Sequence, residues 1–287
     1  MRRTTQFRRL LKDKKLLVAP GAFDGLSARL IERTGFPLIY VTGGGIARSM
    51  GYPDLGLLTM SEVISRVKNI VDVTNIPVLA DADTGYGNAL NVMRAVREFE
   101  AVGVAGIHIE DQVTPKKCGH YEGKSLVPKE EMMKKIEAAR EARTDPDFVI
   151  IARTDARAVE GLERAIERGK RYAEAGADMI FIEAPQSIDE IKKIAKSIAA
   201  PLLINMFKGG KTPLVPMKEL EAMGYRVVIV PSPLQLAAVH TMKELLQVLK
   251  REGTIESFSE RMISFKERDE IVGLPEYEKL ERKFLDL

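Results

Sequence analysis

The stretch FVIIARTDARAVEGLERAIERGKRYAEAGADMIFIEA, residues 148–184, holds two short apolar segments separated by a longer amphipathic one. Segments 148–154 and 179–184 are nearly continuous in apolar and β-branched residues, which is typical of strands buried on both faces. Residues 160–176 instead show the pattern of an amphipathic helix and close with Gly176, the residue type expected just past a helix end. The stretch therefore predicts a strand–helix–strand unit of a parallel sheet.

The same unit recurs along the chain, because similar apolar runs begin at Leu16, Pro37, Pro77, Gly106, Phe148, Met179, Pro201 and Arg226. Eight such units in about 230 residues match an α/β fold of the closed (β/α)8 TIM-type barrel, with an open doubly wound sheet as the alternative. No Pro/Gly/Ser-rich linker divides the chain. We therefore expect one barrel domain over residues 1–287, with additional helices as a C-terminal extension over about 251–287.

Composition limits the kinds of binding partner and the cellular location that we expect for this protein. The chain has 44 basic and 41 acidic residues, and this balance favours neither nucleic acid nor a membrane surface. No apolar run approaches the roughly 20 residues of a membrane span, and the basic N-terminus lacks the apolar segment of a signal peptide. A single cysteine excludes an internal disulfide and a cysteine-cluster metal site, so a cytoplasmic location is expected.

A barrel predicts where its site lies, because catalytic groups gather at the C-terminal ends of the strands. Every expected strand end carries a polar group. These groups are Asp24, Thr42 with Gly43 to Gly45, Asp81 with Asp83, Glu110, Arg153, Glu183, Asn205 and Ser232.

The motif DADTGYG, residues 81–87, places two carboxylates two residues apart at one strand end, so that both point the same way. Like charges at that separation repel, and a hard cation such as Mg²⁺ is the usual resolution. Capping of the next helix would explain Asp81 and Asp83 alone. Glu110 at the neighbouring strand end favours the metal.

Three further motifs suggest ligand chemistry. The run TGGG, residues 42–45, either bares backbone N–H groups for a carboxylate or phosphate or is a plain flexible turn. Arg153 at a strand end is either a satisfied core residue or a bidentate clamp for a carboxylate. Cys118 follows two lysines and precedes Gly119 and His120; these cations predict a reactive thiolate, whereas a buried inert thiol is the alternative.

Taken together, KKCGH (116–120), DADTGYG, TGGG, ARTDA (152–156) and NMFKGGKTPL (205–214) resemble the isocitrate lyase / phosphoenolpyruvate mutase superfamily, in the same order along nearly the whole chain. The resemblance implies a barrel that handles enolates of small α-keto carboxylates and depends on Mg²⁺, with Mn²⁺ as a substitute. It also implies dimers that exchange a C-terminal helix and pair into homotetramers.

The resemblance also implies roles for individual residues. Cys118 would be the general acid that protonates the carbanion left by C–C cleavage, and Arg153, His120 and Glu110 would complete the catalytic group. The metal shell would be Asp54, Asp81, Asp83 and Glu110. The substrate contacts would be Thr42, Gly43, Gly44, Gly119, His120, Arg153, Glu183 and Asn205. The base that deprotonates the substrate hydroxyl is open between Tyr40, His108 and a metal-bound water.

Within the superfamily, the KKCGH loop indicates a lyase rather than a phosphonate mutase or hydrolase or an oxaloacetate decarboxylase. Methylisocitrate lyases hold a third carboxylate with two arginines, and at those places this chain carries Leu236 and Phe265. The branch of 2,3-dimethylmalate lyase and petal death protein resembles the chain in PKKCGH, GGKTPL and the late Phe. The predicted reaction is retro-aldol cleavage of a 2-alkylmalate-type dicarboxylate. The alternatives are 2-methylisocitrate cleavage, a phosphonate mutase or hydrolase or oxaloacetate decarboxylase of the same superfamily, and a non-catalytic binding protein.

Overall fold

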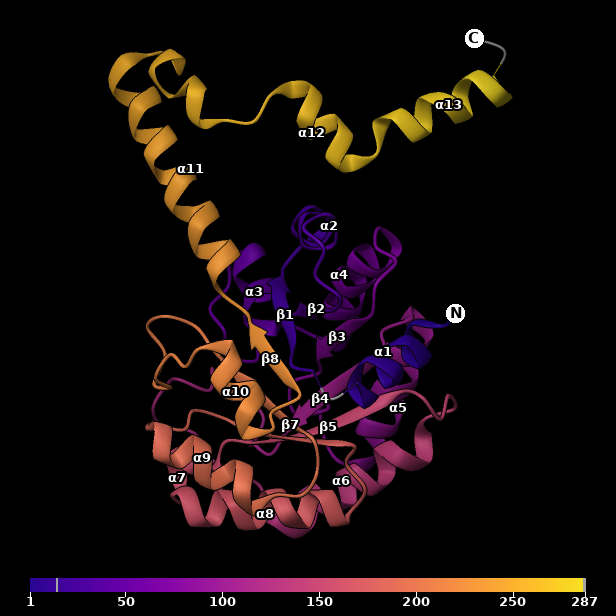
Figure 1. Ribbon diagram of the computed structural model, residues 1–287, viewed down its shortest axis with the longest axis vertical. Coiled ribbons are helices and arrows are strands. Elements are labelled where there is room, and N and C mark those ends of the chain that lie inside the picture. Colours follow the sequence, from indigo (N-terminus) through magenta and orange to yellow (C-terminus); the bar gives the residue numbers. More distant parts are fainter. Residues whose placement is uncertain (14, 286–287) are drawn as a thin grey trace. The chain divides into compact units, whose positions relative to one another are not determined.

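Eight parallel strands close into a barrel in the computed structural model, which describes residues 1–13 and 15–285 (Figure 1). Each strand pairs in parallel with the next, and β8 pairs with β1. The strands are β1 (Leu17–Ala22), β2 (Ile39–Val41), β3 (Val78–Asp81), β4 (Gly106–Glu110), β5 (Val149–Thr154), β6 (Met179–Ile182), β7 (Leu202–Asn205) and β8 (Val227–Val230). The (β/α)8 prediction is confirmed, and the β1–β8 pairing excludes the open sheet.

Helices connect the strands. They are α1 (Arg3–Lys12), α2 (Gly25–Arg33), α3 (Gly43–Ser49), α4 (Met60–Asp72), α5 (Ala89–Val102), α6 (Lys129–Ala142), α7 (Ala156–Val159), α8 (Leu162–Glu174), α9 (Ile188–Ser197) and α10 (Met217–Met223). The helix predicted over 160–176 is α8, preceded by the single turn α7. It begins after Gly161, whose φ of 91° breaks the helical path, and ends before Gly176, whose φ is 103°.

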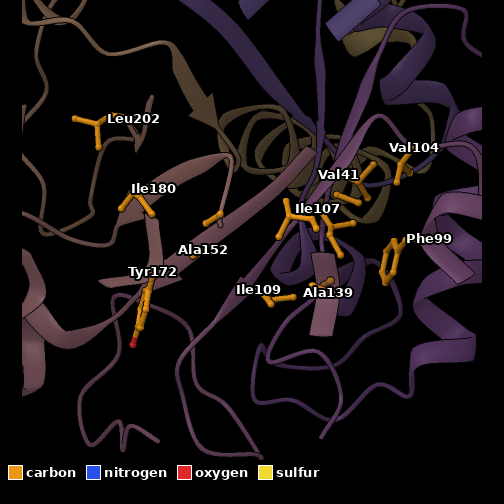
Figure 2. Packing of buried hydrophobic residues seen from close by; sticks show 14 of the residues in the cluster. Val41, Phe99, Val104, Ile107, Ile109, Ala139, Ala152, Tyr172, Ile180 and Leu202 are labelled. Carbon is orange, nitrogen blue, oxygen red and sulfur yellow. The ribbon is translucent and has the colours of Figure 1, made fainter. Parts of the chain in front are cut away.

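The period of two along each strand explains the position of the polar residues. Ala152 of β5 points outward and belongs to the layer between the strands and the helices (Figure 2), and Ile150 belongs to the same layer. Val149 and Ile151 fill the barrel interior, so Arg153 continues that inward row at the strand's C-terminal end. The same parity turns Thr42, Asp81, Glu110, Glu183 and Asn205 toward the barrel axis.

Helix α1 closes the opposite end of the barrel. Phe7 is fully buried against the interior residues, and Leu10 and Leu11 pack beside it. Thr4 Oγ1 donates to Asp145 Oδ2 at 2.8 Å, and Arg8 Nη2 pairs with Asp178 Oδ1 at 2.9 Å. Because this end is sealed, access to the interior comes from the C-terminal ends of the strands.

The chain divides into two compact units, Met1–Pro233 and Leu234–Leu287. The second contains α11 (Pro233–Glu252) beyond its first residue, a 3₁₀ helix (Glu256–Arg261), α12 (Phe265–Val272) and α13 (Leu274–Phe284). The extension expected over 251–287 falls in this unit, and its residues 286 and 287 lie outside the described residues. No helix within the described ranges has the length and apolar character to cross a membrane.

Candidate active site

A cavity of about 200 Å³ opens at the C-terminal ends of the strands. It collects residues from segments far apart in the sequence. Those predicted from the sequence that line it are Tyr40, Thr42, Gly44, Asp54, Asp81, Cys118, Gly119, His120, Arg153, Glu183, Asn205 and Ser232, and Arg48 joins them. The predicted residues Gly43, Asp83 and Glu110 are not among its lining residues. The strand-end rule therefore located the cavity.

Asp24 is the exception among the strand-end groups. Its side chain accepts a hydrogen bond from Ser27 N at 2.7 Å and caps helix α2. Ser27 Oγ in turn accepts from Asp24 N at 3.2 Å, which completes a capping box. The grouping of Asp24 with the catalytic residues is wrong, because its carboxylate is used by the helix that follows it.

One group of carboxylates, here called the acid side, lies around Lys116. Asp54 and Asp81 line the cavity, whereas Asp83 lines a separate cavity that Lys116 also reaches. The Lys116 ammonium lies 2.6 Å from Asp54 Oδ1 and 2.8 Å from Asp83 Oδ1, and the residue is only 5% exposed. Asp83 N donates to Asp81 Oδ1 at 2.9 Å. The sequence suggested that Lys116 would lie beside the Cys118 thiol. In the structure it neutralises carboxylates instead.

The two carboxyls of the DADTGYG motif titrate far apart. Burial raises the pKa of Asp83 to about 6, and the neighbouring Asp81 adds to this although Lys116 opposes it. Burial would also raise the pKa of Asp81, but the charges of His108, Lys116 and Arg153 hold it at about 2. Both carboxyls are therefore largely ionised at neutral pH, as metal ligands must be.

The glycines of TGGG lie against the same carboxylates. A Cβ on Gly43 would stand 2.8 Å from Asp81 Oδ2, and one on Gly44 would stand 2.7 Å from Asp54 Oδ2. The run forms the first turn of α3, where Thr42 Oγ1 accepts from Gly45 N at 3.2 Å. The flexible-turn alternative is therefore wrong, and the missing side chains leave room beside the acids.

The donor set is compatible with a hard cation. On the acid side the Lys116 ammonium pairs with Asp54 and Asp83, and Asp81 lies 3.6 Å from the neutral His108 imidazole, so the three carboxylates leave excess negative charge beside the cavity. Glu110 Oε1 is buried and has no hydrogen-bond partner among residues 1–13 and 15–285. Within those ranges no group of three or more His, Cys, Asp or Glu side chains is placed so that it could hold a metal ion. Mg²⁺ suits such a set, because it keeps several waters and uses few protein ligands.

A second group of carboxylates, here called the arginine side, is organised by Arg153, which lines the cavity with Glu183. Its Nε and Nη2 donate to Asp155 Oδ2 and Oδ1 at 2.9 and 3.1 Å. Its Nη1 lies 3.1 Å from Glu110 Oε2, and Nη2 lies 3.5 Å from Glu183 Oε2. The bidentate pair expected with a ligand is therefore made inside the protein, to Asp155, which lies two residues further along the chain.

Tyr40 and His108 lie between the two sides. Tyr40 Oη is 2.9 Å from His108 Nε2 and donates to Asp81 Oδ2 at 3.3 Å. Burial lowers the pKa of His108, so its imidazole is neutral at neutral pH, and burial together with Asp81 raises that of Tyr40. Tyr40 reaches the cavity, whereas His108 is fully buried behind it.

The β4–α6 loop carries the KKCGH motif over the cavity. Cys118 N donates to Asp54 O at 3.2 Å, and His120 Nδ1 accepts from Lys211 N at 3.0 Å. A Cβ on Gly119 would stand 2.5 Å from Arg153 Nη2, so a larger residue would displace the guanidinium. Burial, followed by the charge of Asp54, raises the pKa of the Cys118 thiol. The prediction of a favoured thiolate is wrong, because the nearby lysines bind other oxygens.

Sequence reasoning missed two residues of this region. Asp155 could have been found, because it follows Arg153 by two residues in ARTDA and shares its side of the strand. Lys124, whose ammonium donates to Gly119 O and lies 3.3 Å from Asp155 Oδ1, has no comparable signal in the sequence. Its partners come from two different segments of the chain.

Residues 7–250 match the sequence profile of the phosphoenolpyruvate phosphomutase family. The chain belongs to that family. It is 48% identical to the 2,3-dimethylmalate lyase of Eubacterium barkeri over 99% of both chains. It is 45% identical to the 2-methylisocitrate lyase of Halalkalibacterium halodurans over 96% of this chain and 92% of the relative. The resemblance inferred from the sequence motifs is confirmed.

Solved structures of the family superpose closely on the chain. A crystal structure of 2,3-dimethylmalate lyase, described as a member of the PEP mutase/isocitrate lyase superfamily, matches with a TM-score of 0.93 at 37% identity, covering 99% of this chain and 95% of that one. A phosphonopyruvate hydrolase in complex with oxalate and Mg²⁺ matches with a TM-score of 0.91 at 34% identity, covering 99% and 100%. The family therefore includes carbon–carbon lyases and a member crystallised with Mg²⁺.

Proposed function

We propose that this protein is a Mg²⁺-dependent carbon–carbon lyase that cleaves a 2-hydroxy dicarboxylate of the 2,3-dimethylmalate type. The products would be pyruvate or a similar oxo acid and a second carboxylate. The observation that carries the proposal is the convergence, on one cavity, of an acid cluster with excess negative charge and a Cys118 thiol whose pKa is raised. The similarity to 2,3-dimethylmalate lyase over the whole chain supports the substrate class.

Asp54, Asp81, Asp83 and Glu110 would hold the metal, and the bound Mg²⁺ would supply positive charge to the oxygens of the oxo-acid end. Thr42 and the N–H groups of Gly43 and Gly44 would bind the carboxylate of that end. The remaining substrate contacts would come from Gly119, His120, Arg153, Glu183 and Asn205.

Two side chains that line the cavity, Tyr40 and Cys118, would move the protons. The substrate hydroxyl proton passes to Tyr40 Oη as Tyr40 turns its own proton from Asp81 Oδ2 to neutral His108 Nε2, 2.9 Å away. The C–C bond then breaks, and its electron pair stays on the α-carbon of the second product. Cys118 donates its S–H proton to that carbon, for which a thiol protonated at neutral pH is suited.

A panel of substrates tests the proposal. We expect kcat/KM for 2,3-dimethylmalate to exceed that for 2-methylisocitrate by about 10²–10⁴-fold, because two missing charge-assisted bonds of about 1.5–3 kcal/mol each leave a third carboxylate uncompensated. This chain carries the uncharged residues Leu236 and Phe265 at the places where methylisocitrate lyases resemble it but carry the two arginines. A preference for 2-methylisocitrate would overturn the dicarboxylate assignment. Turnover of phosphonopyruvate alone would place the protein with the phosphonate enzymes.

One observation favours 2-methylisocitrate as a second candidate. Arg48 lines the cavity and could pair with a third carboxylate. Lys208, another cation in a loop at the strand ends, lines a different cavity. An Arg48→Met variant separates the candidates: it should leave kcat/KM for 2,3-dimethylmalate nearly unchanged if the substrate has two carboxylates, and it should lower turnover of 2-methylisocitrate if Arg48 binds the third.

We also propose that the enzyme is a cytoplasmic homotetramer of helix-exchanged dimers. The second unit supports this, because its helices expose large apolar side chains, including Leu236, Val239, Met242, Leu246 and Phe265. Light scattering coupled to size-exclusion chromatography should give about four times the chain mass of 31.9 kDa. A monomer at micromolar concentration would contradict the assembly.

A further inference from the structure

Lys124 holds the loop that carries Cys118 in place. The Lys124 side chain is 1% exposed, and its ammonium donates to Gly119 O, the carbonyl between Cys118 and His120. The same ammonium lies 3.3 Å from Asp155 Oδ1. One buried cation therefore joins the backbone of the thiol-bearing motif to a carboxylate at the C-terminal end of β5.

Asp155 connects this lysine to the arginine side of the cavity. Its carboxylate is fully buried and binds Arg153 through both oxygens, and Oδ1 is shared between Arg153 Nη2 at 3.1 Å and Lys124. Its backbone is held as well, because Asp155 N donates to Asp111 Oδ1 at 3.0 Å. The carboxylate is thus a rigid reference point that belongs to the barrel rather than to the loop.

Because the Lys124 ammonium is buried, its favourable contacts depend on the position of the loop. An ammonium out of water is costly unless it finds both an opposite charge and hydrogen-bond acceptors. Lys124 satisfies both needs only when the loop is seated, since one partner is Asp155 and the other is the carbonyl of Gly119. The loop position and the pairing of Arg153 are therefore coupled through one carboxylate oxygen.

We propose that Lys124 is a positioning residue that seats Cys118, Gly119 and His120 against Arg153 through Asp155. The expected effect on catalysis rests on the proposed function of Cys118, whereas the effect of Lys124 on the position of the loop does not depend on that function. Without the ammonium, Gly119 O loses its hydrogen-bond donor and the Asp155 carboxylate pairs with Arg153 alone. The loop then moves away from the barrel.

The test compares Lys124→Met with Lys117→Met. Lys117 is a matched control, because its ammonium also donates to a carbonyl of this loop, that of Gly123 at 2.9 Å, but has no link to Asp155 among the described residues. For Lys124→Met we expect kcat on 2,3-dimethylmalate to fall by about 10²-fold with KM nearly unchanged, the loss typical of a misplaced reacting group. Lys117→Met should stay close to wild type.

A second readout needs no substrate. Cys118 is the only cysteine in the chain, so the rate of alkylation by iodoacetamide reports its exposure directly. Cys118 should be alkylated several-fold faster in Lys124→Met than in the wild type or in Lys117→Met. Lys124→Arg keeps the positive charge, so its kcat and its alkylation rate should be closer to those of the wild type. Wild-type kcat and alkylation in Lys124→Met would overturn the proposal. Faster alkylation without turnover of any 2-hydroxy diacid by the wild type would retain the seating and refute the proposed function.

If Lys124→Met does not fold, Lys124→Gln replaces it. The amide still donates a hydrogen bond but carries no charge, so kcat and alkylation should fall between wild type and a fully unseated loop. A Lys124→Gln variant identical to wild type in both measurements would refute a role for the ammonium.

Discussion

The two groups of carboxylates beside the cavity have the same number of members but are neutralised differently. On the acid side a single lysine pairs with two of the three, whereas on the arginine side an arginine and a lysine pair with all three. Lysine is a point charge on a flexible stem, and arginine is a rigid fork. The acid side thus keeps excess negative charge for an incoming cation. The arginine side is a pre-organised support, from which Glu110 would also reach the proposed metal. The carboxylates are Asp54, Asp81 and Asp83 on the first side, and Glu110, Asp155 and Glu183 on the second.

Unusual backbone conformations occur on both sides. Asp83 and Tyr86 on the acid side have positive φ, at 48° and 62°, which non-glycine residues seldom adopt. On the arginine side Arg153 lies in the extended strand β5, but Ala184, directly after Glu183, has a φ of 57° and its N–H donates to Glu183 Oε1 at 2.9 Å. The two sides therefore differ in charge rather than in backbone strain.

Loss of one acid-side carboxylate should have the largest effect. Asp83→Asn tolerates the positive φ better than Asp83→Ala and removes only the charge. We expect activity to fall by about 10³-fold or more and the Mg²⁺-induced rise in Tm to disappear, as measured by calorimetry with and without the ion. Asp24→Asn is the control, because asparagine also caps a helix well, and it should retain both. Normal Mg²⁺ dependence in Asp83→Asn would place the metal elsewhere.

Replacing the thiol should rank next. Cys118→Ser keeps the size of the side chain but raises the pKa of the proton donor, so kcat should fall by about 10²–10⁴-fold with little change in KM. Steady-state kinetics on 2,3-dimethylmalate measures it. A serine variant with wild-type kcat would reduce Cys118 to a packing residue.

Removing the acid-side lysine tests the charge comparison itself. Lys116→Met leaves Asp54 and Asp83 without their cation, and breaking a buried pair in this way costs about 3–5 kcal/mol. We expect the Tm of the metal-free protein to fall by roughly 10 °C, and saturating Mg²⁺ to recover more stability than it adds to the wild type. An unchanged Tm would show that the acids do not need Lys116. Lys117→Met serves again as the control.

The smallest expected effect concerns pH. The pKa of Cys118 is raised by burial, so the folded protein keeps its thiol protonated above the pH at which a free thiol ionises. The alkylation rate should therefore begin to rise at higher pH than that of glutathione, and kcat should decline over the same alkaline range as the acid is lost. Stability contributed by the buried neutral thiol is likewise present at low pH and lost as pH rises through the raised pKa. A midpoint below that of glutathione would contradict this.

The sequence by itself determined the barrel and most of the candidate site. Strand periodicity is local, so the parity that buries Ile151 also turns Arg153 inward, and closure of parallel strands brings all their ends to one face. Asp81, Glu110 and Glu183 could be predicted on that basis alone. Only the tertiary structure decided the partners of the long, flexible cations: Lys116 lies among the acids rather than beside the thiol, and Lys124 reaches Asp155. A lysine side chain has many rotamers, and its choice among buried carboxylates depends on segments distant in the sequence, which no local pattern encodes.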